Sequence, residues 1–174
     1  MRFLWVAVLL ASTIGVSTAS DSNYQLGSGD QIRIQVFGEP DLTIDQIRLG
    51  ESGAITYPYL GALQLSGLTL SQVEKLIHRG LKGDYLINPS VSVSVMEYRP
   101  FFINGEVRQP GGYPFQPGLT VRQAIAIAGG LTERASRRGM SLTRNQDSRE
   151  TTLKVEMATP VFPGDSIFIE DSFF

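Results

Sequence analysis

The sequence feature that most constrains the fold is a succession of turn and helix-boundary residues between positions 103 and 132. A Pro-Gly-Gly run at 110–112 lies between apolar alternating segments and allows a tight reversal without strained side chains. Thr120 and Gln123 have the spacing of a capping box, in which each side chain bonds the other residue's backbone amide. One face of the helix that follows is apolar, with Val121, Ala124, Ile125 and Ala128. A Gly-Gly pair at 129–130 can end it. The segment therefore predicts strand, turn, strand, helix and stop.

Short strands are predicted in the first half of the chain. Ile32, Ile34 and Val36 alternate with polar residues, which is the period of a half-buried strand, so we expect a strand over 31–37. Beyond Pro40, short apolar runs are separated by glycines, which is typical of short strands joined by tight turns. These strands are expected at 44–49, 54–57 and 62–65.

A second helix is predicted from Thr69, which again has a glutamine three residues later, at Gln72. Its apolar face consists of Val73, Leu76, Ile77 and Leu81. Basic residues are concentrated in its last turns, where their positive charges interact favourably with the negative end of the helix dipole. Gly83 can end the helix. Serines and valines alternate over 90–95, which predicts a strand with the serines on its exposed face.

Two short patterns recur along the chain. Gly-Leu-Thr precedes both predicted helices, at 67–69 and at 118–120. Gly-Asp precedes an alternating apolar run at 29–30 and again at 164–165. Each Gly-Asp pair therefore predicts a turn that leads into a strand.

The predicted elements describe an α+β chain with two small domains. Proline at 100 breaks regular strand pairing, so we place the boundary between the domains at 98–100. The first domain is expected at 20–98 and the second at 99–174.

The order of these motifs resembles a known family. Gly-Glu-Val at 105–107, the Pro-Gly turn, the helix and Ala-Gly-Gly at 128–130 are similar to the soluble-ligand-binding β-grasp (SLBB) module of polysaccharide export proteins. Upstream, the stretches similar to the export domain that precedes this module in the family are Leu26–Val36, Glu39–Thr43, Tyr57–Gly61 and Gly67–Thr69. The resemblance is to the Wza-type outer-membrane polysaccharide export family and covers the chain from about Tyr24 to Phe174. It implies an export domain followed by a β-grasp domain.

The resemblance also implies a function. Family members form rings that pass capsule or exopolysaccharide through the periplasm and the outer membrane, and they connect to an inner-membrane polysaccharide copolymerase. We therefore expect this chain to be a non-enzymatic, ring-forming subunit of an export channel, with the polysaccharide as its transported substrate. The alternative is a monomeric periplasmic module that binds a glycan or another soluble ligand. Measurable, saturable glycan affinity of a monomer would favour that alternative.

The first 19 residues have the pattern of a secretory signal peptide. Arg2 supplies the positive start, residues 4–14 are apolar, and small residues at 17–19 suit cleavage. Export to the periplasm, with association to the outer membrane, is therefore expected. The chain has no cysteine, so it lacks the lipid-modified cysteine that many family members carry. Attachment to the membrane is expected to come from a partner.

The end of the sequence also differs from long family members, which carry further β-grasp repeats and a C-terminal amphipathic helix that lines an outer-membrane pore. This sequence reaches Phe174 directly after the last predicted strand. A polar polymer crosses hydrocarbon only inside a closed helix or strand assembly. The expectation is that a separate outer-membrane β-barrel makes the pore and that this subunit is its periplasmic adaptor.

The ionisable residues favour structural interpretations. Asp30 and Asp165 lie in glycine turns, where an aspartate commonly bonds nearby backbone amides. His78 is the only histidine, on the basic edge of a helix, and is expected to be solvated or to compensate the helix dipole. One histidine and no cysteine disfavour a zinc site. We predict no catalytic residue, metal or cofactor, and the net charge of −2 disfavours nucleic acid as a partner.

Arg134, Arg137 and Arg138 form a basic cluster after the Gly-Gly stop. A solvated loop is the simpler interpretation. The sharper hypothesis is that these arginines contact an acidic neighbouring subunit or an anionic sugar chain through their planar donor groups. Six aromatic residues could also stack on sugars but are mostly expected in the core or at interfaces: Tyr57, Tyr59, Phe101, Phe102, Tyr113 and Phe115.

Overall fold

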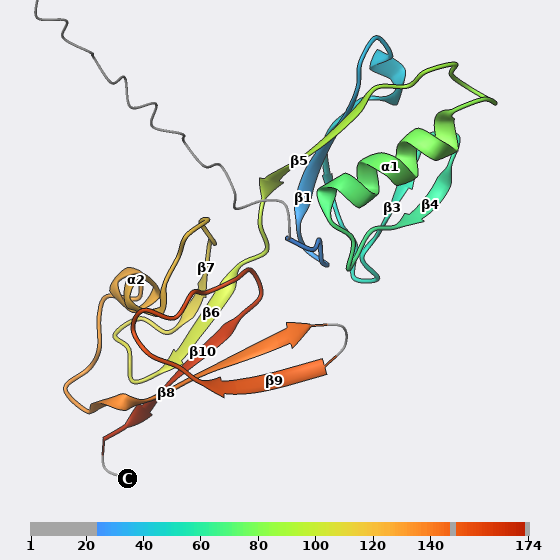
Figure 1. Ribbon diagram of the computed structural model, residues 1–174. Helices are drawn as coiled ribbons and strands as arrows, with labels where there is room; N and C mark the ends of the chain where they lie inside the picture. The colour runs from blue at the N-terminus through green and yellow to red at the C-terminus, as the bar shows by residue number, and fades with distance from the viewer. Residues whose placement is uncertain (1–23, 147–148, 173–174) are drawn as a thin grey trace, which may run out of the picture.

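The computed structural model describes residues 24–146 and 149–172. Figure 1 shows two packed groups of elements, joined by the short segment between β5 and β6. The predicted signal peptide at 1–19 lies outside the described residues. Both groups combine strands with one α-helix, so the chain is α+β as predicted.

The first group consists of β1 (Gln31–Val36), the 3₁₀ turn η1 (Pro40–Leu42), β2 (Ile44–Arg48), β3 (Ala54–Tyr57), β4 (Gly61–Gln64), α1 (Leu70–Leu81) and β5 (Val91–Glu97). Strand β1 lies between β2 and β5 in an antiparallel sheet, and β3 and β4 form a separate hairpin. Each strand expected from the sequence is present, with bounds that agree to within two residues.

Helix α1 begins with the predicted capping box. The Thr69 side chain accepts from the Gln72 backbone amide, and the Gln72 side chain accepts from the Thr69 amide. Val73, Ile77 and Leu81 are fully buried. They pack with the buried face of β1 and with Tyr57 and Leu65 from the hairpin segment, so one apolar cluster holds helix and strands together.

The second group consists of β6 (Phe101–Gly105), β7 (Gly111–Tyr113), α2 (Val121–Ile127), β8 (Ala135–Gln146), β9 (Arg149–Lys154) and β10 (Ser166–Asp171). The sheet order is β7-β6-β10-β8-β9. Strands β6 and β7 form the predicted hairpin, with Phe101 opposite Tyr113. Strand β10 lies at the centre of the sheet, parallel to β6 and antiparallel to β8.

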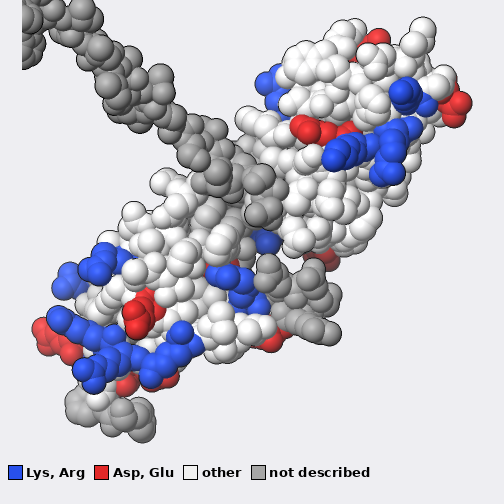
Figure 2. All heavy atoms as spheres, in the orientation of Figure 1, with Lys and Arg blue, Asp and Glu red and all other residues white. Residues whose placement is uncertain are grey.

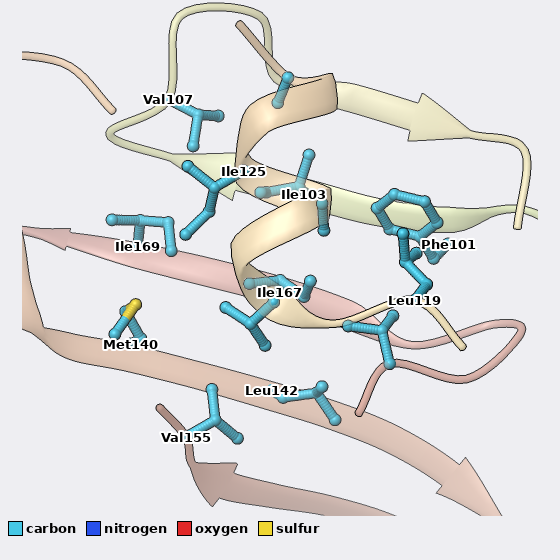
Figure 3. Packing of buried hydrophobic residues seen from close by; sticks show 14 residues of the cluster. Phe101, Ile103, Val107, Leu119, Ile125, Met140, Leu142, Val155, Ile167 and Ile169 are labelled. Carbon is cyan, nitrogen blue, oxygen red and sulfur yellow. The ribbon is translucent and has the colours of Figure 1, made fainter. Parts of the chain in front are cut away.

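Helix α2 covers one face of this sheet (Figure 3). Its capping box and its buried face are those predicted, because Thr120 and Gln123 bond reciprocally and Val121, Ala124 and Ile125 are buried. The buried apolar residues beneath the helix come from three strands and their connections, and include Phe101, Ile103, Met140, Leu142, Ile167 and Ile169. The opposite face of the sheet has no helix over it among the described residues.

Gly105 shows why a glycine ends β6. Its φ is +83°, and a Cβ at this position would collide with the carbonyl oxygen of Ile169 in the neighbouring strand. An L-residue would be strained on both counts. The close approach allows Glu106 to donate its backbone N–H to the same carbonyl, at 3.0 Å.

Candidate functional site

The three arginines proposed as contact residues lie around the start of β8. Arg134 is in the preceding turn and forms an ion pair with Asp171 at the end of β10. Arg137 and Arg138 are exposed within β8. The loop interpretation is therefore wrong for these two residues, because the strand already begins at Ala135. Figure 2 shows basic and acidic side chains beside one another at this end of the second group. The role of the arginines as subunit or polymer contacts stays a prediction.

Asp30 is fully buried and accepts four hydrogen bonds. Its Oδ2 accepts from the Gly27 amide at 2.8 Å, from the Tyr24 hydroxyl at 2.6 Å and from Arg99 Nη1 at 3.0 Å. Its Oδ1 accepts from the backbone amide of Arg99 at 2.8 Å. The carboxylate thus connects the turn before β1 with the segment that joins the two groups of elements.

Asp165 occupies the equivalent place in the second group and is 1% exposed. Its Oδ2 accepts from the Phe162 amide at 2.7 Å, as Asp30 does from the amide three residues before it. Arg144 in β8 donates to both carboxylate oxygens, from Nε at 2.8 Å and from Nη2 at 2.7 Å. The Arg144 guanidinium lies over the Phe162 ring, 4.4 Å from its centroid.

The prediction that both aspartates bond nearby backbone amides is confirmed. Sequence reasoning missed their arginine partners, because Arg99 and Arg144 lie 69 and 21 residues away along the chain. The repeated Gly-Asp pattern was the one signal that marked the two turns as related. Backbone amides and an arginine occupy each carboxylate, so the geometry is that of a structural ion pair.

Two tyrosines of the first group, Tyr24 and Tyr57, have a raised pKa. Burial, together with the hydrogen bond to Asp30, raises the pKa of Tyr24 far above its ordinary value. Burial also raises the pKa of Tyr57 to about 12, and its hydroxyl donates to the Leu42 carbonyl at 2.7 Å. Both phenols are therefore held neutral, as hydrogen-bond donors in the structure.

His78 lies in the last turn of α1, where compensation of the helix dipole was one of the two expectations, but it is not the fully solvated residue of the other. It is partly buried, and its Nδ1 lies 2.8 Å from the carbonyl oxygen of Pro89. It lines an open pocket between α1 and the start of β5, with a volume of about 470 Å³. The other lining residues are Glu74, Lys75, Arg79 and Val91. Figure 2 shows basic side chains gathered over α1.

The aromatic candidates separate into two classes. Tyr57 and Phe101 are core residues, as predicted. Phe102 is 45% exposed, on the uncovered face of the second sheet, and Phe168 of β10 is 50% exposed on the same face. Tyr59 is also exposed, and its ring lies 4.9 Å from that of Tyr85. The serines at 90, 92 and 94 are exposed, as their alternation with valines predicted.

Within residues 24–146 and 149–172, no three His, Cys, Asp or Glu side chains are grouped in a way that could hold a metal ion. In the same part of the chain, neither α-helix has the length and apolar character needed to span a membrane.

Comparison with known families supports the organisation described above. The family model described as "Polysaccharide biosynthesis/export protein" matches residues 18–96, and the SLBB domain model matches residues 100–154. The sheet of the second group continues beyond the SLBB match, because its central strand β10 lies at 166–171.

Curated relatives agree with these matches. The chain is 37% identical over 144 residues to the exopolysaccharide production protein ExoF of Rhizobium meliloti, over 75% of this chain and 33% of that protein. It is 28% identical over 143 residues to the EPS I polysaccharide export outer membrane protein EpsA of Ralstonia nicotianae, over 68% of this chain and 37% of that protein. It is 26% identical over 166 residues to the polysialic acid transport protein KpsD of Escherichia coli, over 89% of this chain and 29% of that protein.

The chain thus spans about a third of the length of the curated relatives that it matches. Two family models matched in sequence order, together with relatives named for production, export and transport of polysaccharides, agree with the α+β organisation of the structure. The chain belongs to the polysaccharide biosynthesis/export protein family, with an export domain followed by an SLBB domain.

Proposed function

We propose that this chain is a non-enzymatic subunit of an assembly that exports exopolysaccharide or capsule polysaccharide. The observation that carries the proposal is the export domain followed directly by an SLBB domain, in a chain 37% identical to a protein named for exopolysaccharide production. The structural ion pairs of Asp30 and Asp165 support the non-enzymatic part, because both carboxylates are occupied by arginines and backbone amides.

The proposed subunit works in the periplasm, in association with the outer membrane, after removal of the signal peptide at 1–19. We place the limit between its domains at 98–99. Two observations support that limit: the buried core of the first domain ends at Val93, and that of the second begins at Phe101.

Copies of the chain are proposed to lie side by side in a ring. Two features support self-association: Phe102 and Phe168 expose aromatic surface on the uncovered face of the second sheet, and β7 and β9 are its edge strands. The other proposed partners are an inner-membrane polysaccharide copolymerase and a component of the outer membrane. The separate outer-membrane β-barrel expected from the sequence stays a prediction.

The experiment that tests the function is deletion of the gene, followed by measurement of the polymer in the periplasm and outside the cell. We expect the external polymer to fall while polymer or its precursors accumulate inside, with recovery in the complemented strain. If the amount of external polymer stayed unchanged, the proposed export function would be wrong.

Sedimentation of the purified protein tests the assembly. A ring predicts a species several times heavier than the monomer. A monomer that binds glycan saturably would instead favour the monomeric binding module. The variant Arg137→Glu with Arg138→Glu tests the arginines, because reversing two exposed charges should weaken assembly or export if they contact an acidic partner. If both stay unchanged, the proposed contact role of these arginines is wrong.

A further inference from the structure

The pocket between α1 and the start of β5 is unusual because four of its five lining side chains are ionisable. Glu74, Lys75, His78 and Arg79 follow one side of α1, while Val91 supplies an apolar surface. The pocket is open to solvent and its volume of about 470 Å³ is sufficient for a sugar residue.

Two of these side chains are fixed by bonds to the backbone of the neighbouring strand segment. Glu74 Oε1 accepts from the Val93 amide at 2.9 Å. His78 Nδ1 bonds the Pro89 carbonyl at 2.8 Å, and since a carbonyl only accepts, Nδ1 carries the proton. The other ring nitrogen, Nε2, is then the one left for a further partner. Side chains that are already fixed reduce the conformational entropy that the protein loses when a ligand binds.

Neither of the two basic side chains forms an ion pair within the part of the chain that the structure describes. Within the described residues, the ion pairs involve Arg33, Arg48, Arg99, Arg134 and Arg144, but neither Lys75 nor Arg79. Arg79 donates its Nε to the Lys75 carbonyl at 3.2 Å, which directs the guanidinium along the helix. The helix dipole does not account for Lys75, because the effect falls off within the last turn and α1 continues to Leu81.

We propose that this pocket binds the carboxylate of an acidic sugar unit in the exported polysaccharide. The inference rests on the proposed export function and names the chemistry of its substrate. Lys75 and Arg79 donate charge-assisted hydrogen bonds to the carboxylate. Val91 contacts the C–H surface of the ring. The second oxygen of Glu74 accepts from a sugar hydroxyl, so it selects a ligand that has both hydroxyl and carboxylate groups.

A sugar fits the pocket better than an added β-strand from another protein chain. Strand addition needs unpaired backbone groups along the edge of β5. At this edge the Val93 amide is already bonded to Glu74, the Pro89 carbonyl is bonded to His78, and a proline has no N–H to offer. The two cations of the pocket, Lys75 and Arg79, form no ion pair among the described residues and suit an anionic ligand better than a backbone strand.

The test is titration calorimetry of the full chain with short oligomers of glucuronic acid, compared with glucose oligomers of the same length. We expect saturable binding of the acidic oligomer that weakens with added salt, and at least tenfold weaker binding of the neutral one, on the order of the loss from one charged hydrogen bond. The double variant Lys75→Gln, Arg79→Gln should weaken acidic binding by about tenfold or more for the same reason.

Arg122→Gln with Lys154→Gln is the matched control, because it removes two exposed charges from the second domain. Glutamine has nearly the helix propensity of lysine and arginine, so α1 should stay folded, and circular dichroism verifies this. Equal affinity for both oligomers, or equal losses in variant and control, would overturn the proposal. So would a variant that alters sedimentation but not oligomer affinity, since the pocket would then be an interface between copies. If deletion of the gene blocks export while the variant binds normally, this inference fails and the proposed function stands.

Discussion

The two Gly-Asp turns have the same local structure but different arginine partners. In each turn the aspartate accepts the amide of the residue three positions earlier, and its own amide returns a bond to that residue's carbonyl. Each aspartate is buried and each pairs with an arginine whose side chain is about a quarter exposed. A strand begins directly after each turn, at Gln31 and at Ser166.

The difference lies in where the arginine comes from. Arg144 belongs to β8, which pairs with the strand that Asp165 precedes, so that ion pair stays within one sheet. Arg99 lies between β5 and β6, and its side chain fills the space beside both Gly27 and Gly164. The Asp30 pair therefore holds the two domains against one another. The same turn can thus stabilise a domain or connect two, depending on one distant residue.

Removal of either carboxylate should have the largest effect on stability. Asp30→Ala and Asp165→Ala each leave a partly buried arginine without its partner, and we expect a loss of about 3–5 kcal/mol from each. Urea denaturation measures the loss. If the comparison is correct, small-angle scattering will show an altered domain arrangement for Asp30→Ala alone. An altered arrangement in both variants would contradict the distinction.

Removal of the Tyr24 hydroxyl tests the extra bond in the first turn. Tyr24→Phe deletes a donor to a buried carboxylate, for which we expect about 1.5–3 kcal/mol. The control is Tyr57→Phe, which deletes a donor to a neutral carbonyl and should cost about 1 kcal/mol. Equal losses of unfolding free energy would show that the charge of Asp30 adds nothing to the bond.

Gly164→Ala should disturb the junction between the domains. The φ of Gly164 is +83°, and a Cβ there would lie 2.7 Å from Arg99 Nε. Gly118→Ala is the matched control, because its φ is +84° and its Cβ would meet nothing within 4 Å. Both variants include roughly 1–2 kcal/mol of backbone strain. The excess loss for Gly164→Ala, about 1–2 kcal/mol, measures displacement of Arg99. No excess in urea denaturation would show that Arg99 moves freely.

High pH should weaken the fold through the buried phenols. Burial raises the pKa of Tyr57 from the ordinary value of 10.0, which an unfolded chain would have, to about 12. The contribution of Tyr57 to the free energy of unfolding is fully present below pH 10. It is lost as the pH rises toward 12, because in that window the Tyr57 phenol ionises only in the unfolded state. Tyr57→Phe should make the decline between pH 10 and 12 shallower in urea denaturation. If the free energy of unfolding fell equally with pH in both proteins, the fold would not raise the pKa of Tyr57.

The exposed ion pair in the first sheet should have the smallest effect. Arg33 and Asp45 lie 3.0 Å apart, and the Asp45 side chain is 82% exposed. Asp45→Asn is expected to cost less than about 1 kcal/mol, because solvent and salt screen such pairs. If Asp45→Asn lost as much unfolding free energy as Asp165→Ala, burial would not explain why the ion pairs differ in strength.

Local patterns predicted much of the fold. Thr-x-x-Gln located the start of both helices, since a capping box depends only on residues within one turn. The alternation of apolar and polar residues predicted β1 and β5, and the Pro-Gly-Gly run predicted the β6–β7 hairpin. The buried faces of both helices also followed from spacing alone.

Interactions between distant residues could not be predicted in this way. Nothing in the surroundings of Arg99 or Arg144 indicated a buried aspartate as partner. Strand β8 was mistaken for a loop at Arg137 and Arg138, because paired arginines interrupt apolar alternation. The pocket beside α1 was missed because it depends on how α1 lies along β5. From the sequence, Lys75 and Arg79 were interpreted only as residues that compensate the helix dipole.

The central position of β10 in its sheet determines the order in which the two domains can fold. The core of the first domain is complete once residue 93 is available, so this domain can fold early during synthesis or translocation. The second sheet waits for residues 166–171, because β6 and β8 are joined only through β10. Until then β6 and β8 each lack a partner on one side, a state in which a chaperone or a second copy of the chain could bind them first.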